Sequence, residues 1–83
     1  MHGTTTEPKH FCLVINGLPT YGERCHIEAA LSICRAYIQD LHYSFNKKTI
    51  TYTLTTQQFS IFTERFKKTP YWNIAEISYV YRT

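Results

Sequence analysis

The chain has 83 residues and a formal charge of +3, from nine Lys and Arg against six Asp and Glu. This length allows one domain, with one sheet packed on two helices, and excludes a second lobe. Hydrophobic residues make up 43% of the sequence, which indicates a folded core and excludes a largely disordered chain. The charge is too small for the dense basic stripe that nucleic-acid domains usually carry.

A polar, threonine-rich segment comes first and is followed by an apolar run. Residues 1–9 predict a flexible tail, so we assign the single domain to residues 10–83. Residues 11–15 are continuously apolar and end at Asn16-Gly17, which favours a central strand covered on both sides. A loop containing Gly and Pro follows this strand.

The clearest pattern predicts a long amphipathic helix. Thr20 and Glu23 have the spacing of a capping box, in which each side chain bonds the other residue's backbone N–H at a helix start. Apolar residues then recur at helical spacing, which predicts a helix over about residues 21–40. The residues of this apolar stripe are Ile27, Leu31, Cys34, Ile38 and Leu41.

A β-hairpin is expected next. Residues 42–45 and 49–54 flank the polar turn 46–48, a pattern typical of two strands joined by a short connection. In the second of these strands apolar and aromatic residues alternate with threonines, which predicts one face in the core and the other in solvent.

A second helix and a last strand complete the chain. Thr55 and Gln58 have the spacing of another capping box, and Pro70 is expected to end the helix that follows. Residues 74–81 are rich in β-branched and aromatic residues, which predicts a strand. The apolar stripe of this helix consists of Phe59, Phe62 and Phe66.

The element order β-α-β-β-α-β predicts an α+β fold, the ferredoxin-like two-layer sandwich. We expect a four-stranded antiparallel sheet in the spatial order 4-1-3-2, with both helices on one face. Because this fold carries many unrelated functions, it predicts no activity by itself. The residues expected to be mostly buried are Leu13, Ile15, Ile27, Leu31, Cys34, Ile38, Ile50, Tyr52, Leu54, Phe59, Phe62, Phe66 and Ile77.

Two segments resemble motifs of known families. Residues 17–22 have the spacing of a phosphate-binding P-loop, but Glu23 and Arg24 stand where that motif has Lys and then Ser or Thr. Residues 13–19 resemble the first-strand motif of RNA-recognition domains, and this resemblance implies RNA binding by aromatic side chains of the sheet. In the third strand only Tyr52 matches those aromatics, and the alternation of the strand turns it toward the core.

The sequence contains no cofactor or metal motif. Cys12, Cys25 and Cys34 are an odd number without a paired framework, which favours a reducing, cytoplasmic compartment. No Cys-x2-Cys or His-x3-His pair occurs, and no apolar run approaches the roughly 20 residues of a membrane span. We therefore expect no metal, no cofactor and no membrane contact. An enzyme would require Cys25 or a histidine such as His42 to lie in a pocket beside a base, and we expect no catalytic residues.

The sequence favours a small, non-catalytic protein-binding module, either a monomer or a homodimer. Small domains of this kind include inhibitors and regulators encoded by bacteriophages and other mobile elements, among them anti-CRISPR and other anti-defence proteins. Aromatic and Arg side chains are the preferred anchors of protein interfaces. The candidate protein-binding residues are Tyr71, Trp72, Tyr79, Tyr81 and Arg82.

The alternative function is RNA or DNA binding by basic loops on a ferredoxin-like sheet. Lys and Arg side chains neutralise the phosphate backbone, and such binding weakens steeply as salt increases. The candidate nucleic-acid-binding residues are Lys47, Lys48, Arg65, Lys67 and Lys68.

Overall fold

The computed structural model describes the backbone of residues 8–81 and the side chains of residues 8–79. Residues 1–7, the predicted tail, lie outside the described residues. The elements in chain order are β1 (Lys9–Asn16), α1 (Tyr21–Ile33), β2 (Ala36–Ser44), β3 (Thr49–Thr56), α2 (Phe59–Phe66), the 3₁₀ helix η1 (Pro70–Ile74) and β4 (Ala75–Tyr81).

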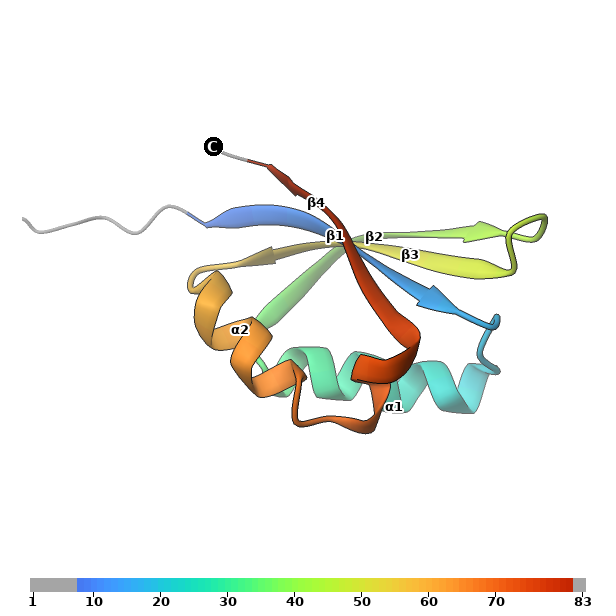
Figure 1. Ribbon diagram of the computed structural model, residues 1–83, viewed down its shortest axis with the longest axis horizontal. Helices are drawn as coiled ribbons and strands as arrows, with labels where there is room; N and C mark the ends of the chain where they lie inside the picture. The colour runs from blue at the N-terminus through green and yellow to red at the C-terminus, as the bar shows by residue number, and fades with distance from the viewer. Residues whose placement is uncertain (1–7, 82–83) are drawn as a thin grey trace, which may run out of the picture.

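The four strands form one antiparallel sheet in the order β2-β3-β1-β4, and both helices lie on the same face of it (Figure 1). The predicted α+β fold, strand order and placement of the helices are therefore confirmed. η1 was not predicted, and it takes up the residues between the end of α2 and the last strand.

β1 is a central strand, as predicted, but helices cover only one of its faces. Phe11, Leu13 and Ile15 point into the helix layer and are fully buried. Cys12 and Val14 point to the opposite face, which no described helix covers (Figure 1). The expectation of a strand covered on both sides is wrong, because neighbouring strands rather than a second layer surround Cys12 and Val14.

The predicted helix over residues 21–40 is too long. α1 ends at Ile33, Cys34 is its C-cap, and Arg35 has the left-handed φ of 70° that turns the chain into β2. The apolar spacing was misleading because β2 has a bulge between Ile38 and Asp40. The extra residue brings Ile38 and Leu41 onto one strand face, so that a spacing of three imitates a helix.

The predicted second capping box does not form. β3 continues to Thr56, whose hydroxyl donates to the carbonyl of Arg35 at 2.9 Å, and Gln58 is the N-cap of α2 without a side-chain cap bond. The start of α2 is fixed instead by aromatic packing. Phe59 lies edge-on to Phe11 with ring centroids 5.0 Å apart.

The core lies between the sheet and the two helices. Of the residues expected to be buried, Phe59 and Ile77 are only half-buried, and Ile38 is 41% exposed because it lies at the free edge of the sheet rather than in α1. The other expected core residues are buried, and the structure adds Phe11, Ala36 and Thr56 to them.

Candidate functional site

The sheet presents one face to the helices and leaves the other uncovered (Figure 1). The register of the strands identifies the residues of the uncovered face, because directly opposite residues of antiparallel strands point the same way. We call this surface the open face. Its described residues are His10, Cys12, Val14 and Asn16 of β1, Tyr37, Asp40, His42 and Ser44 of β2, Thr49, Thr51, Thr53 and Thr55 of β3, and Glu76 and Tyr79 of β4.

Two exposed tyrosines stand on the open face, at opposite edges of the sheet. Tyr37 of β2 and Tyr79 of β4 are each 60% exposed, and half-buried threonines of β3 lie between their strands. Thr55 Oγ1 of β3 lies 3.2 Å from Nδ1 of His10 of β1, so these two strands are also joined through side chains. The surface is aromatic and polar, and it is built on a rigid sheet.

The charge of the open face is acidic. Asp40 and Glu76 are its only charged side chains other than histidine among residues 8–79. The one Lys or Arg in the described strands is Lys9, and its Nζ points to the helix side, 5.5 Å from the centroid of the Phe59 ring. The described side chains of the open face therefore include no Lys or Arg that could neutralise a nucleic-acid phosphate backbone.

The predicted protein-binding residues do not form one surface. Tyr71 and Trp72 lie in η1 on the helix side and are half-buried. Trp72 packs edge-on against Phe66, with ring centroids 6.2 Å apart. Tyr79 lies on the open face, and Tyr81 pairs with His10 in the backbone register. The side chain of Tyr81 and all of Arg82 lie outside the described residues.

The predicted nucleic-acid-binding residues divide between two ends of the molecule. Lys47 and Lys48 are in the turn between β2 and β3, which lies at the opposite end of the sheet from α2 (Figure 1). Arg65 is in α2, and Lys67 and Lys68 follow it directly. Lys67 also has its Nζ 5.5 Å from the centroid of the Trp72 ring. These cations do not make one continuous basic patch.

Sequence reasoning missed Tyr37, Asp40 and Arg35. All three fell inside or at the end of the helix predicted over residues 21–40, so their side chains were not assigned to a sheet or to its edge. The β-branched and aromatic pair Tyr37-Ile38 was the available signal for a strand there. The helical spacing of the apolar residues outweighed it.

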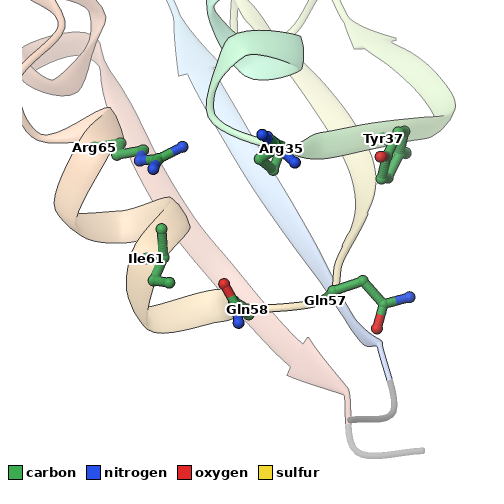
Figure 2. A pocket seen from close by; sticks show the side chains of 6 residues that line it. All are labelled: Arg35, Tyr37, Gln57, Gln58, Ile61 and Arg65. Atoms are coloured by element: carbon green, nitrogen blue, oxygen red, sulfur yellow. The ribbon is translucent and has the colours of Figure 1, made fainter. Parts of the chain in front are cut away.

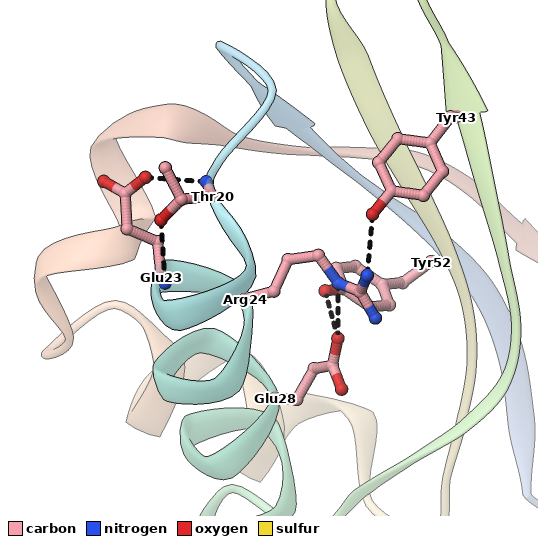
Figure 3. A network of polar contacts seen from close by, with 6 residues as sticks. All are labelled: Thr20, Glu23, Arg24, Glu28, Tyr43 and Tyr52. Carbon is pink, nitrogen blue, oxygen red and sulfur yellow. Dashed lines mark hydrogen bonds and ion pairs between the residues drawn. The ribbon is translucent and has the colours of Figure 1, made fainter.

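A network of polar side chains joins α1 to β2 and β3 (Figure 3). Arg24 Nε lies 3.0 Å from Glu28 Oε2, and Arg24 Nη1 donates to the hydroxyl of Tyr43 at 2.6 Å. The hydroxyl of Tyr52 donates to the same Glu28 oxygen at 2.8 Å. The groups bind one another, and their role is to hold the helix on the sheet.

The electrostatics of this region follow from those contacts. The hydrogen bond to Glu28 raises the pKa of Arg24. Burial, and then the hydrogen bond to Glu28, raise the pKa of Tyr52 well above its usual range. At the start of α1, hydrogen bonds from the backbone and side chain of Thr20 lower the pKa of Glu23. Each of these groups is held in its usual ionisation state at neutral pH.

Cys25 is exposed on α1, and residues 8–81 contain no group of three or more His, Cys, Asp or Glu side chains that could hold a metal ion. Within the same range, no helix has the length and apolar character needed to cross a membrane.

Comparisons with protein-family models, curated proteins and solved structures give no match for the chain.

Proposed function

We propose that the protein is a non-catalytic protein-binding module that contacts its partner through the open face of the sheet. The observation that carries this proposal is the uncovered sheet surface with two tyrosines that are each 60% exposed. Tyr offers a large contact area and a hydrogen-bonding hydroxyl at a low cost in side-chain entropy, so it is a frequent interface anchor.

The charges of the open face favour a protein over a nucleic acid. Asp40 and Glu76 would lie against the phosphates of a bound strand, and no Lys or Arg of the described strands stands on this face to offset them. The complementary partner is a protein whose contact surface is neutral or basic.

An inhibitor or regulator that occupies a partner's surface is the role that we propose for such a module. Proteins of bacteriophages and mobile elements, including anti-CRISPR proteins, act in this way, and the small size of the chain and its uncovered sheet face support this role. Tyr71 and Trp72 stay in the proposal only as residues that support the fold from the helix side, since both pack against the core.

The test begins with a partner captured by the tagged protein and identified by mass spectrometry. Its affinity for wild type is then compared with that for Tyr79→Ala. We expect about 30-fold weaker binding, since an interface Tyr contributes on the order of 2 kcal/mol when truncated. Glu76→Lys should also weaken binding if the partner's surface is basic. Both variants are first checked for an unchanged melting temperature.

Tyr21→Ala is the matched control, because Tyr21 is 76% exposed but lies on α1, away from the open face. The proposal is wrong if Tyr21→Ala weakens binding as much as Tyr79→Ala does. It is also wrong if single-stranded RNA or DNA binds tightly and Lys47→Ala and Lys48→Ala abolish that binding. A second copy of the chain as the captured partner would make the module a homodimer.

A further inference from the structure

A cavity of about 380 Å³ lies at the end of the molecule where α1 gives way to β2 and β3 gives way to α2 (Figure 2). This volume is within the range of roughly 300–1,000 Å³ that is usual for small-molecule sites. The side chains that line the cavity are Arg35, Tyr37, Gln57, Gln58, Ile61 and Arg65.

Two guanidinium groups of this cavity have no partner within the described chain. The side chains of Arg35 and Arg65 make no hydrogen bond or ion pair with any residue from 8 to 79, and no Asp or Glu lines the cavity. The guanidinium of Arg65 points from α2 toward Arg35 (Figure 2). The cavity is therefore a region of concentrated positive charge without an internal counterion.

The backbone holds both arginines in place. The N–H of Arg35 donates to the carbonyl of Ser32 at 3.0 Å, and its own carbonyl accepts from Thr56. Arg65 lies one helical turn after Ile61 on α2. The charge of Arg65 also reaches Cys34, the residue before Arg35, where it opposes the larger effect of burial, which raises the pKa of that thiol.

We propose that this cavity binds a small, soluble phosphomonoester, with the phosphate between Arg35 and Arg65. A phosphomonoester near neutral pH carries close to two negative charges, which match two guanidiniums, and the planar fork of Arg fits phosphate oxygens in pairs. The amides of Gln57 and Gln58 add neutral donors and acceptors at the wall.

The rim of the cavity suits a ligand with a flat ring. Tyr37 lines the cavity and is largely exposed, so its ring is open to stacking by a planar group attached to the phosphate. A nucleoside monophosphate has both parts and is a suitable probe. The cavity shares Tyr37 with the open face, but it does not include Tyr79, and the open face does not include Arg35 or Arg65. Variants of these three residues therefore test the two proposals separately.

The experiment titrates the protein with AMP, with inorganic phosphate and with adenosine, and follows backbone amide shifts by NMR. We expect AMP to bind more tightly than phosphate, adenosine not to bind, and the shifts to centre on the residues of the cavity. Arg35→Gln and Arg65→Gln should each weaken AMP binding about tenfold or more, by the usual contribution of a hydrogen bond to a charged group. Tyr37→Ala should weaken AMP binding and leave phosphate binding unchanged.

Lys47→Gln and Lys68→Gln are the matched controls, since each removes one positive charge outside the cavity. Both should bind AMP as wild type does. Equal weakening by all four variants would show non-specific attraction and overturn the proposal. Absence of shifts at millimolar AMP and phosphate would also overturn it. A phosphoserine peptide that binds more tightly than AMP would replace the small-molecule assignment by a phosphorylated protein.

Discussion

The two helices differ in how the polar groups on and beside them are hydrogen-bonded. At the start of α1, Thr20 and Glu23 form a complete capping box, and Arg24 is held by Glu28 and Tyr43 (Figure 3). The N-cap of α2, Gln58, makes no side-chain cap bond. Neither Arg65, in the last turn of α2, nor Arg35, which lines the same cavity, pairs with a described carboxylate (Figure 2).

This difference separates arginines whose charge is paired within the fold from arginines whose charge is free to bind a ligand. An arginine that is paired with a carboxylate of the same helix, as Arg24 is with Glu28, stabilises the fold, and its occupied N–H donors are not free to bind a ligand. The side chains of Arg35 and Arg65 have no carboxylate partner among the described residues, so their charge is available to an external anion. The hydrogen bonds within the chain, rather than the residue type, distinguish the two cases.

The largest expected effect tests what holds α2 in place without a cap. Phe62 is fully buried, between Phe11 and Phe66, with ring centroids 5.0 and 5.4 Å away. Phe62→Ala should lower the free energy of unfolding by about 3–5 kcal/mol, enough to unfold a small domain. Urea denaturation followed by circular dichroism measures this loss, and a melting temperature within a few degrees of wild type would contradict the placement of α2.

The next effect tests the polar network of α1. Glu28→Ala removes the acceptor shared by Arg24 and the buried hydroxyl of Tyr52. We expect a loss of about 1–3 kcal/mol in unfolding free energy, because a buried donor is left without a partner. Glu64→Ala is the control, since Glu64 is exposed on α2 and should change stability by no more than about 0.5 kcal/mol. Equal losses in the two variants would remove the distinction between the helices.

The two N-caps provide a direct comparison. Thr20→Ala should lower the free energy of unfolding by roughly 1 kcal/mol, since the hydroxyl of Thr20 accepts from the backbone N–H of Glu23. Gln58→Ala should change it by less than about 0.5 kcal/mol, because no cap bond is lost. Chemical denaturation of both variants checks the order. A larger loss for Gln58→Ala would mean that α2 has a cap after all.

The smallest effect is a pH dependence from Tyr52. Its pKa is raised in the folded protein, so the stabilisation by its neutral hydroxyl is complete below the unfolded pKa of about 10 and is lost as the pH rises beyond it. We expect wild type to lose stability between about pH 9 and pH 11, and Tyr52→Phe to lose less over the same range. Urea midpoints at both pH values measure this, and parallel curves would contradict the assignment.

The overall fold could be predicted from the sequence, because its main signals are local. The capping box at Thr20, the alternation of Ile50, Tyr52 and Leu54, and the phenylalanine stripe each specify an element without reference to the rest of the chain. The end of α1 could not be predicted, because the bulge that places Ile38 and Leu41 on one face depends on pairing with β3.

The candidate sites were harder to predict than the fold. Tyr37 and Tyr79 lie on one surface because the pairing of β2 with β3, of β3 with β1 and of β1 with β4 turns both side chains to the same face. Arg35 and Arg65 line one cavity because a left-handed turn and a short helix lie at the same end of the molecule. Neither arrangement leaves a spacing pattern in the sequence, so the aromatic content predicts an interface without indicating which tyrosines share a surface.

The central position of β1 has a consequence for the order in which the chain folds. β2 and β3 are joined by a short turn and can pair locally, and β3 also pairs with one edge of β1. The other edge of β1 is paired only by β4, which brings His10 to Tyr81 and Ile15 to Ala75. Bringing β4 to β1 closes a loop that contains most of the chain, and the entropic cost of this closure comes before the contacts between the two strands form. Such long-range pairing slows folding. During synthesis the apolar side chains of β1 emerge first and obtain their last neighbour only when β4 has been made, so the growing chain exposes one edge of its central strand until then.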